Sequence, residues 1–523
     1  MSIRLRRRLL LLVLLGIAPI ALACVVRVSS GTKIQAVDTS RSPVTVRSPV
    51  KAHLTDGSTI IYRDGVIIRD QILFPRKAAS RYSVLLTPMS QVEVPLDSVM
   101  GLESYSTRTN AGATLVLSTL ATAGGLALSA AAAVALFGSC PTIYADSMGT
   151  PVLQAEVFAT RVSPLLEARD IDLLSARPDR AGVLTLEVRN EALETHYINH
   201  FELLEVRHSA RQRLIPDEHG KPLVVTRFDP VASARDRAGR DLRDVFARHD
   251  RVVFATDSGT LARASGADPY DYVDVAVARP AGDSAVLGLE LRNSLLNTVL
   301  LYDMMLAAPG ARSIDWLGQD MQRIGPMLRF GRWYREHFGL RVSVYDGKEY
   351  REIERHPTYG PVAWREAATV VPVLERDSLR LRLRFAADEW RIDWIGVAPD
   401  FARPRTRTIR IDRVRATNDS IAAETKRSLG SADERYVQTG PGERFWVSFA
   451  TGAAPIDSSR TFLLASQGYY SEWIRGSWVK AASDTAKFTP STEALDRTLR
   501  RWSLQRDSLD RVFYSTKIPM RVQ

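Results

Sequence analysis

The stretch GVLTLEVRNEALETHYINHFELLEVRHS, residues 182–209, gives the clearest indication of the fold class. It contains two runs rich in apolar and β-branched residues, Val183–Arg189 and Tyr197–His208. Runs of this length and composition are typical of β-strands. The stretch therefore predicts the opening of a β-sandwich.

Strand patterns continue toward the C-terminus. In LRLRLRF, residues 379–385, apolar residues alternate with arginines, which predicts a strand with one buried face. Two segments depart from this pattern: 314–339 is helix-like, and Ser491–Phe513 is an amphipathic, charged helix. The expected fold class is mainly β, with several antiparallel β-sandwich or barrel-like domains and a C-terminal helix.

A smaller β pattern precedes these regions. From Val50 to Tyr105, short apolar runs are separated by the turn pairs Asp56-Gly57 and Asp64-Gly65, as in antiparallel hairpins. The pattern closes on PLDSV, residues 95–99, and resembles small barrel-like modules of bacterial envelope proteins. It predicts a small β domain without catalytic residues.

Residues 109–145 contain no charged side chain and are dominated by Ala, Gly, Leu and Ser. Gly124-Gly125 divides this stretch into two arms, each shorter than the ~20 residues that a membrane-spanning helix needs. Small residues would let the arms approach closely. Three interpretations stay open: an Ala/Gly-rich helical hairpin buried in the protein or a partner, an interfacial or re-entrant membrane insertion, and a true span over 111–137.

The N-terminus has the pattern of an export signal. Arg4 and Arg6–Arg8 precede an apolar run from Leu9 to Leu22, and a small residue stands directly before Cys24. Residues 1–23 are therefore predicted to be a signal peptide.

Cys24 is the predicted lipidation site. A small residue before a cysteine resembles the bacterial lipobox, although Ala21 stands where Leu is commoner. Two or more acyl chains on Cys24 would anchor the protein firmly in a bilayer. Plain secretion after the A-x-A site Ala21-Leu22-Ala23 and an uncleaved anchor helix are the alternatives. Val25 stands where Asp would signal inner-membrane retention, which favours the outer membrane.

Charge and cysteine content disfavour two further function classes. The net charge is +11, and removal of the signal peptide with its four arginines leaves +7. Basic residues in the rest of the chain are interspersed with acidic ones, so nucleic acid is not an expected partner. The two cysteines, Cys24 and Cys140, cannot form a disulfide framework or a thiolate zinc cluster. Cys140 is expected to be a buried structural residue.

Common catalytic signatures are absent from the sequence. It contains no G-x-S-x-G, G-x-x-x-x-G-K-[ST], G-x-G-x-x-G or H-E-x-x-H. His196 and His200 are four residues apart, but their neighbours favour a strand, which would separate them by about 13 Å. Accordingly, no catalytic, cofactor-binding or metal-ligating residue is assigned, and no cofactor is expected.

Two Asp-Trp pairs, Asp315-Trp316 and Asp393-Trp394, have the residue types of a sugar site, an acid beside an aromatic stacking surface. The simpler interpretation is a strand with a buried tryptophan and an outward aspartate. Acid pairs of glycoside hydrolases come from distant strands and are not recognisable from one sequence.

Several segments resemble one group of proteins. They include FGSCPTIY (137–144), LRNSLLNTVLLYDMMLA (291–307) and FLLASQGYYSEWIR (462–475). Together they resemble uncharacterised predicted lipoproteins of bacterial envelopes, roughly from Val50 to Trp478. The resemblance implies a mostly β, exported architecture and transfers no site residues.

These features predict a lipid-anchored, non-catalytic protein of the bacterial cell envelope, at the outer membrane, with a binding, structural or assembly role. Its expected partners are membrane lipid, through Cys24, and an envelope protein or polysaccharide. The alternatives are an envelope glycan hydrolase with unidentified acids and an inner-membrane protein spanning at 111–137.

The expected division of the chain is 1–23, signal peptide; 24–49, tether; 50–108, small β domain; 109–139, apolar helical hairpin or membrane segment; 140–279, β domain; 280–400, β domain with a helical insert; 401–482, β domain; and 483–523, C-terminal helical tail.

Overall fold

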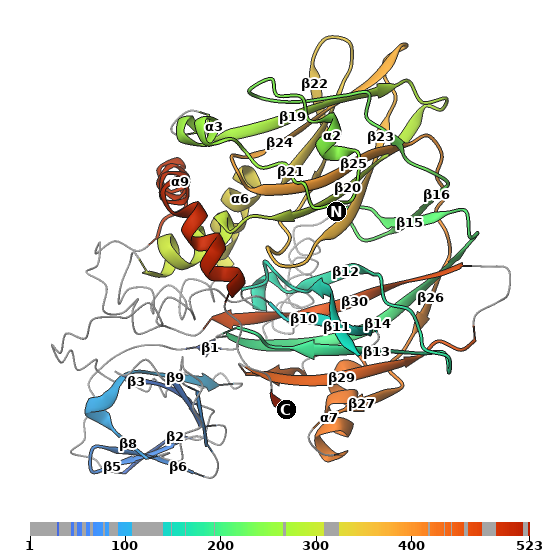
Figure 1. Cartoon of the computed structure of the whole chain (residues 1–523). Helices are drawn as coiled ribbons and strands as arrows, with labels where there is room; N and C mark the ends of the chain where they lie inside the picture. Colours follow the sequence, from blue (N-terminus) through green and yellow to red (C-terminus); the bar gives the residue numbers. More distant parts are fainter. Residues whose placement is uncertain are drawn as a thin grey trace, which may run out of the picture.

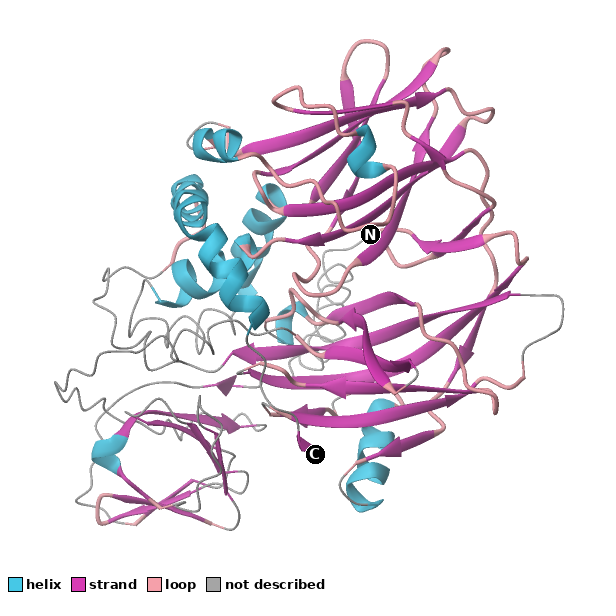
Figure 2. Cartoon of the chain, viewed as in Figure 1, coloured by secondary structure: helices cyan, strands magenta, loops and turns pink. Residues whose placement is uncertain are grey.

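The computed structural model describes most of the chain. The described residues are 29–30, 43–46, 50–54, 59–62, 66–76, 79–82, 93–106, 140–147, 149–162, 164–192, 194–264, 268–307, 324–416, 419–433, 435–440, 442–453, 459–472, 488–515 and 521–522. They form several antiparallel sheets and a long C-terminal helix, which confirms the expected mainly β fold (Figure 1, Figure 2). The signal peptide, Cys24 and the segment 109–139 lie outside the described residues.

A small β unit lies near the N-terminus and is blue in Figure 1. Two sheets, with strand orders β1-β9-β3-β4-β7 and β2-β5-β6-β8, enclose a core that includes Ile60, Tyr62 and Leu73. Strands β1 and β2 come from the segment expected to be a tether. The elements are β1 (Ser29–Ser30), β2 (Val44–Val46), β3 (Val50–Leu54), β4 (Thr59–Tyr62), β5 (Val66–Arg69), β6 (Ile72–Pro75), β7 (Ala79–Tyr82), β8 (Val94–Pro95), η2 (Leu96–Ser98) and β9 (Val99–Ser106).

The first of two large units, which we name the host sandwich, comprises residues 142–208 and 406–472. One sheet has the order β11-β10-β13-β29-β27, and the other has the order β12-β30-β14-β26. Leu186, Phe201 and Phe445 belong to the apolar core of this unit. The elements are β10 (Thr142–Ser147), β11 (Thr150–Glu156), η4 (Pro164–Leu166), β12 (Ala168–Leu174), β13 (Val183–Arg189), β14 (Glu194–His208), β26 (Thr406–Ile409), β27 (Arg413–Arg415), α7 (Asp419–Leu429), β28 (Val437–Thr439), β29 (Glu443–Ala450) and β30 (Ser459–Glu472), with β31 (Arg521–Val522) beside β29.

The second large unit, which we name the inserted sandwich, comprises residues 229–398. Its sheets have the orders β17-β25-β20-β23 and β18-β19-β24-β21-β22, around a core that includes Leu289, Phe385 and Trp390. A separate hairpin, β15 (Arg213–Pro216) with β16 (Pro222–Val225), precedes it. The elements are β17 (Asp229–Pro230), β18 (Ser233–Asp236), α2 (Arg243–Phe246), β19 (Tyr270–Ala278), β20 (Ser284–Asn293), β21 (Leu340–Tyr345), β22 (Tyr350–His356), β23 (Arg365–Pro372), β24 (Ser378–Ala386) and β25 (Trp390–Ala398).

Strand β24 shows how the alternating pattern produces a half-buried strand. The apolar residues of 379–385 are almost fully buried in the core of the inserted sandwich. The alternating arginines lie on the other face, where each covers a tyrosine ring: Arg380 lies 3.9 Å from the centroid of Tyr345, and Arg384 lies 4.0 Å from that of Tyr270. Cation–π contacts of this kind let a charged face pack without losing its exposure to water.

The two sandwiches are nested in the sequence. The chain leaves the host sandwich after β14 and returns to it at β26, with the inserted sandwich between. Strands therefore pair across the domain boundaries that the sequence predicted. β19 pairs with β24 across the boundary at 279, and β14 pairs with β30 across both that boundary and the one at 400. Nesting of this kind leaves no local signature, because each strand has the same period whichever sheet receives it.

Helices fill one side of the junction between the sandwiches. These junction helices pack around an apolar cluster that includes Leu295, Trp333 and Trp502. The helix-like insert and the C-terminal helix expected from the sequence are both among them. Within the described part of the chain, no helix combines the length and the apolar character needed to span a membrane. The junction helices are α3 (Ser258–Arg263), α4 (Leu296–Thr298), the π-helix η5 (Val299–Ala307), α6 (Ile324–His337) and α9 (Thr492–Ser515).

Arg365 of β23 joins the inserted sandwich to the host sandwich. Its Nη2 lies 2.9 Å from Asp170 Oδ1 and 3.3 Å from Asp172 Oδ1, both on β12. The guanidinium also lies 4.4 Å from the ring centroid of Tyr359. Burial raises the pKa of Asp172 to about 8. At Asp170 burial also acts to raise the pKa, but Arg365, Arg161 and the backbone N–H of Phe158 together outweigh it and the pKa is lowered. Asp170 is therefore the anionic partner of this largely buried cation.

We expect Arg365→Met to destabilise the protein by about 3 kcal/mol, the lower end of the cost of breaking a buried ion pair, because it leaves a largely buried carboxylate without its cation. Urea unfolding near neutral pH measures the loss. Arg169→Met, on the same strand as Asp170 but at a side chain that is 52% exposed, should cost less than about 1 kcal/mol. Equal losses in the two variants would contradict the assigned role of Arg365.

Candidate functional site

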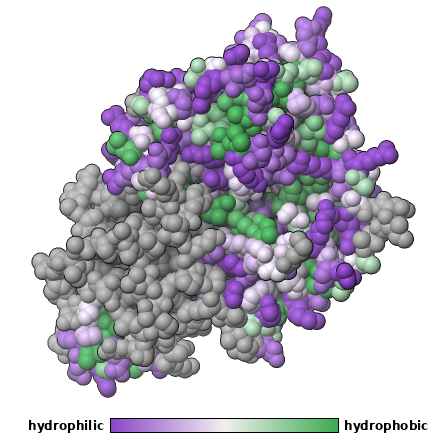
Figure 3. Space-filling view, viewed as in Figure 1, coloured by the Kyte–Doolittle hydropathy of each residue, from purple (hydrophilic) through white to green (hydrophobic). Residues whose placement is uncertain are grey.

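A cavity of about 410 Å³ lies where the two sandwiches and the junction helices meet, and we name it the junction pocket. Its volume falls within the range of about 300–1,000 Å³ that is typical of small-ligand sites. In Figure 3 hydrophilic residues cover most of the coloured surface, with hydrophobic residues gathered on the inserted sandwich and between the two sandwiches.

The junction helices provide the apolar wall of the pocket. Leu300, Leu301 and Met305 come from η5, and Phe330 comes from α6. Several of these side chains also belong to, or pack against, the apolar cluster beneath the helices, so this wall is anchored in a packed core. An aliphatic or aromatic ligand body would exchange water for these groups, at a gain of roughly 25 cal/mol per Å² of apolar surface.

Glu156, the last residue of β11, is a buried acid in the pocket wall. Its Oε2 accepts hydrogen bonds from the backbone N–H groups of Val362 (2.8 Å) and Ala363 (3.3 Å), while Oε1 has no hydrogen-bond partner among the described residues. Burial raises its pKa from 4.5 to about 7 against the opposing effect of those two N–H groups. The carboxylate fits because residue 360 is glycine: a Cβ at Gly360 would lie 2.0 Å from Oε2.

Three arginines also line the junction pocket: Arg161, Arg335 and Arg355. Glu156 is the only acidic side chain among the described lining residues, and its raised pKa leaves it partly neutral near pH 7. Of the three arginines, Arg355 also pairs with Glu352 at 2.6 Å. The pocket therefore combines an apolar wall with several arginines, one of which already has a carboxylate partner. Arginine recognises carboxylate and phosphate groups through a planar, multidentate fork.

Cys140 lies in the pocket wall as a free thiol that is 5% exposed. Its pKa is raised, first by burial and then by the carboxylates of Glu194 and Glu156, while Tyr470 acts in the opposite direction. Thiolate, rather than thiol, is the reactive form of cysteine. The expectation of a buried structural cysteine fits this environment.

His196 and His200 lie on opposite faces of β14. The pairing of β14 with β30 shifts register between Ile198 and His200, so Asn199 is an extra residue that reverses the alternation of side chains. His196 is fully buried, with Nε2 hydrogen-bonded to Glu194 at 2.7 Å, and burial lowers its pKa to about 3. The predicted strand is confirmed, and the bulge directs the two imidazoles away from any shared ligand.

Asp393 and Trp394 lie at a second bulge, where β25 shifts register against β20. Asp393 is fully buried and accepts hydrogen bonds from the backbone N–H (2.6 Å) and Nη1 (3.1 Å) of Arg251. Trp394 is 7% exposed, with His249 stacked on its ring at a centroid distance of 4.6 Å. The tryptophan is buried as expected, the aspartate is not outward, and Asp315-Trp316 lies outside the described residues.

No protein-family model and no curated protein matches this chain. Among solved structures, it is similar to the C-terminal carbohydrate-binding module (CBM6) of a laminarinase from Zobellia galactanivorans, at 8% identity over 38% of this chain and 98% of that one, with a TM-score of 0.15. An α-xylosidase from Xanthomonas citri matches at 10% identity over 81% of this chain and 38% of that one, with a TM-score of 0.15. An exo-β-1,3-galactanase from Phanerochaete chrysosporium matches at 8% identity over 68% and 82%, with a TM-score of 0.13. Similarities at this level carry no functional argument.

We expect the ionisation of Glu156 to reduce stability as the pH rises. A buried acid with a raised pKa binds its proton more tightly in the folded state, so the free energy of unfolding falls between about pH 4.5 and about pH 7. The side chain of Glu156→Gln stays neutral at every pH, so the free energy of unfolding of this variant should fall less as the pH rises. Above pH 7 the variant should therefore be more stable than the wild type.

Urea unfolding at a series of pH values across this range tests the expectation. Glu349→Gln provides the control, because that side chain is 71% exposed, and its profile should follow that of the wild type. Parallel profiles for the wild type and Glu156→Gln would contradict the raised pKa of Glu156.

Proposed function

We propose that this chain is a lipid-anchored binding protein of the bacterial cell envelope, and that its junction pocket binds an anionic amphiphile. The observation that carries the proposal is the combination, in one cavity of about 410 Å³, of an apolar wall with three arginines. Small-molecule sites typically pair such a wall with a few well-placed polar groups.

The two kinds of side chain that line the pocket suit different parts of a ligand. The side chains of η5 and α6 suit a hydrocarbon body, and Arg161, Arg335 and Arg355 suit a carboxylate or phosphate headgroup. Glu156 Oε1 has no partner among the described residues, so a ligand hydroxyl or amide near it would satisfy a buried polar atom. Acyl-containing molecules of a bacterial envelope have this chemistry.

Glycan hydrolysis receives less support from the described acids. Glu156 and Asp172 both have raised pKa values, about 7 and about 8, and would be suited to proton transfer. The cleft that both of them line has a volume of only about 20 Å³. A cavity of that size holds about one water molecule, not a sugar ring. We therefore favour binding over hydrolysis.

The sequence supports the anchor. A basic start, an apolar run and a small residue before Cys24 form a lipobox-like signal, and thioether lipidation of Cys24 would attach the protein to the membrane. The proposed location is the outer membrane, on the evidence of Val25.

Palmitate labelling and membrane fractionation test the anchor. Wild-type protein should incorporate label and fractionate with the outer membrane, and Cys24→Ala should lose both properties. Cys140→Ala, at the only other cysteine, should keep both. An unlabelled protein that stays membrane-bound in every variant would instead assign anchoring to residues 111–137.

Filling the pocket from α6 tests ligand binding. Gly331 lines the pocket, and a Cβ at this position would meet no atom within 4 Å. Gly331→Phe should therefore occupy the cavity without straining the helix, and replacing a helical glycine should raise helix propensity. We expect the affinity for cis-parinaric acid, a fluorescent fatty acid, to fall by at least about tenfold, or roughly 1.4 kcal/mol.

Gly325→Phe is the matched control, since it adds the same ring to the same helix at a glycine that does not line the pocket. Its affinity should equal that of the wild type. Fluorescence titration of both variants in the Cys24→Ala background keeps bound lipid from the anchor out of the measurement. Equal affinity in Gly331→Phe and the wild type would refute binding in the junction pocket.

A further inference from the structure

The turn between β15 and β16 is held in one conformation. Asp217 Oδ1 accepts hydrogen bonds from the backbone N–H groups of His219 (3.1 Å) and Lys221 (2.7 Å). Gly220 has a φ of +75°, and a Cβ there would lie 2.5 Å from Ile171 Cβ of β12. The turn therefore packs closely against the host sandwich. Its hydrogen bonds fix the backbone of Glu218 and His219, the two central residues.

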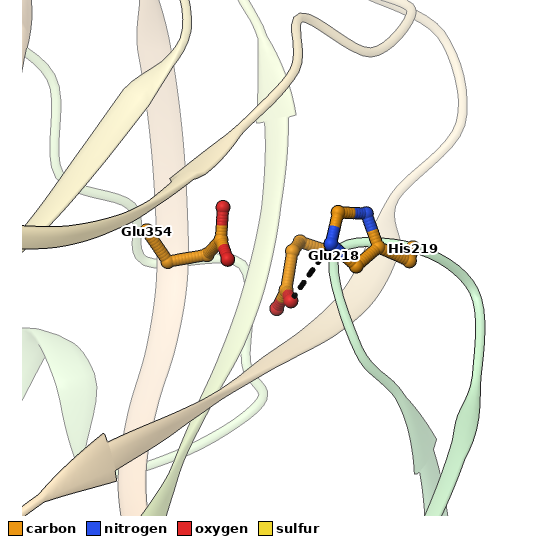
Figure 4. A group of neighbouring side chains, drawn as sticks. All are labelled: Glu218, His219 and Glu354. Carbon is orange, nitrogen blue, oxygen red and sulfur yellow. Dashed lines mark ion pairs between the residues drawn. The ribbon is translucent and has the colours of Figure 1, made fainter.

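Three side chains meet beside this turn: Glu218 and His219 from the turn, and Glu354 from β22 (Figure 4). One ligand atom from each lies within 4.8 Å of the others. Figure 4 shows the carboxylate of Glu218 between that of Glu354 and the imidazole of His219. The Glu218 side chain is only 10% exposed, and its Oε2 has no hydrogen-bond partner among the described residues.

Within the described part of the chain, His219 is the only basic side chain that pairs with a carboxylate of this cluster, at 3.6 Å from Glu218. Among the described residues, no arginine or lysine forms an ion pair with Glu218 or Glu354, whereas the adjacent Asp217 pairs with Arg403 at 3.2 Å. The pKa of Glu218 is raised to about 7, first by burial and then by the negative charges of Asp217 and Glu354. A bound cation would offset the repulsion between these carboxylates and would give Glu218 Oε2 a partner.

The other group of potential ligands in the described part of the chain differs on this point. His249, Glu290 and Asp393 also lie within 4.8 Å of one another. There, Arg251 Nη1 lies 2.6 Å from Glu290 and 3.1 Å from Asp393, so a guanidinium already occupies the position of a cation. A metal ion has no electrostatic advantage at that place.

We propose that Glu218, His219 and Glu354 bind a divalent transition-metal ion, best represented by Zn²⁺. One imidazole and two carboxylates match a zinc site with three protein ligands and one water molecule. Ca²⁺ and Mg²⁺ prefer oxygen ligands alone. Ligand atoms about 2.1 Å from a tetrahedral ion are about 3.4 Å apart, and Glu218 Oε1 lies 3.6 Å from His219 Nε2.

The ion would fasten the β15–β16 hairpin to β22. Glu354 belongs to the inserted sandwich, and the turn that carries Glu218 contacts Ile171 of the host sandwich. The site therefore joins elements on both sides of the boundary between the sandwiches. It uses no residue of the junction pocket, so it does not depend on the proposed ligand.

Calorimetric titration of the untagged, chelator-treated full chain with Zn²⁺ tests the proposal. We expect one equivalent to bind, and the unfolding midpoint to rise with Zn²⁺ concentration. Glu218→Gln and Glu354→Gln should each weaken binding by about 100-fold, at the upper end of the roughly 10–100-fold loss seen when only a supporting group is removed. The unfolding midpoint of each variant without metal checks that it is folded.

Glu352→Gln is the matched control: it removes the same charge from the same strand, at a side chain that pairs with Arg355 at 2.6 Å. Its Zn²⁺ affinity should equal that of the wild type. Absence of saturable binding, binding that persists in Glu218→Gln and Glu354→Gln, or a preference for Ca²⁺ over Zn²⁺ would each overturn the proposal.

Discussion

The ion pair between the largely buried guanidinium of Arg365 and Asp170 ties the two sandwiches together. Each sandwich encloses an apolar core of its own, and the β15–β16 hairpin packs apolar side chains against both sandwiches. Domains of one chain ordinarily move relative to each other unless their interface is large and hydrophobic. An ion pair between β23 and the aspartates of β12 restricts this motion, because breaking it leaves a largely buried charge at a cost of about 3 kcal/mol. The junction pocket takes its walls from both sides of this contact and therefore depends on it.

Burial also reduces the negative charge that the carboxyl groups near the junction pocket carry. It raises the pKa of Glu156 and of Glu389 to about 7, although both carboxylates accept hydrogen bonds from backbone N–H groups. Arg161, Arg335 and Arg355 supply the positive charge in the pocket wall. Near neutral pH Glu156 is thus partly discharged, and the arginines of the pocket, of which Arg355 is paired with Glu352, favour an anionic headgroup over a cationic one. Burial, with the nearby carboxylates of Glu194 and Glu156, likewise raises the pKa of Cys140 and keeps it as a thiol.

Local sequence patterns predicted the elements of the fold more reliably than their partners. Val183–Arg189 is a strand with the expected bounds, and the C-terminal helix lies where the amphipathic pattern placed it. The alternation in 379–385 identified both the buried face of β24 and its arginine face. The nesting of one sandwich in the other was not predictable, because pairing such as that of β14 with β30 joins residues about 260 positions apart. The pocket and the cluster at Glu218 share this origin: their members are brought together by sheet pairing and carry no motif.

Bulges explain why the chemically interesting positions escaped the periodic analysis. In β14 the extra residue Asn199 separates the two histidines onto opposite faces. At the bulge of β25, Asp393 accepts a hydrogen bond from the backbone N–H of Arg251. In β22 the register shifts between the partners of Glu352 and Glu354, so that one glutamate pairs with Arg355 at the surface and the other faces Glu218. A bulge re-aims a side chain by one position without changing the composition of the strand. A strict period of two therefore predicts the wrong face for the residues that lie beyond these bulges.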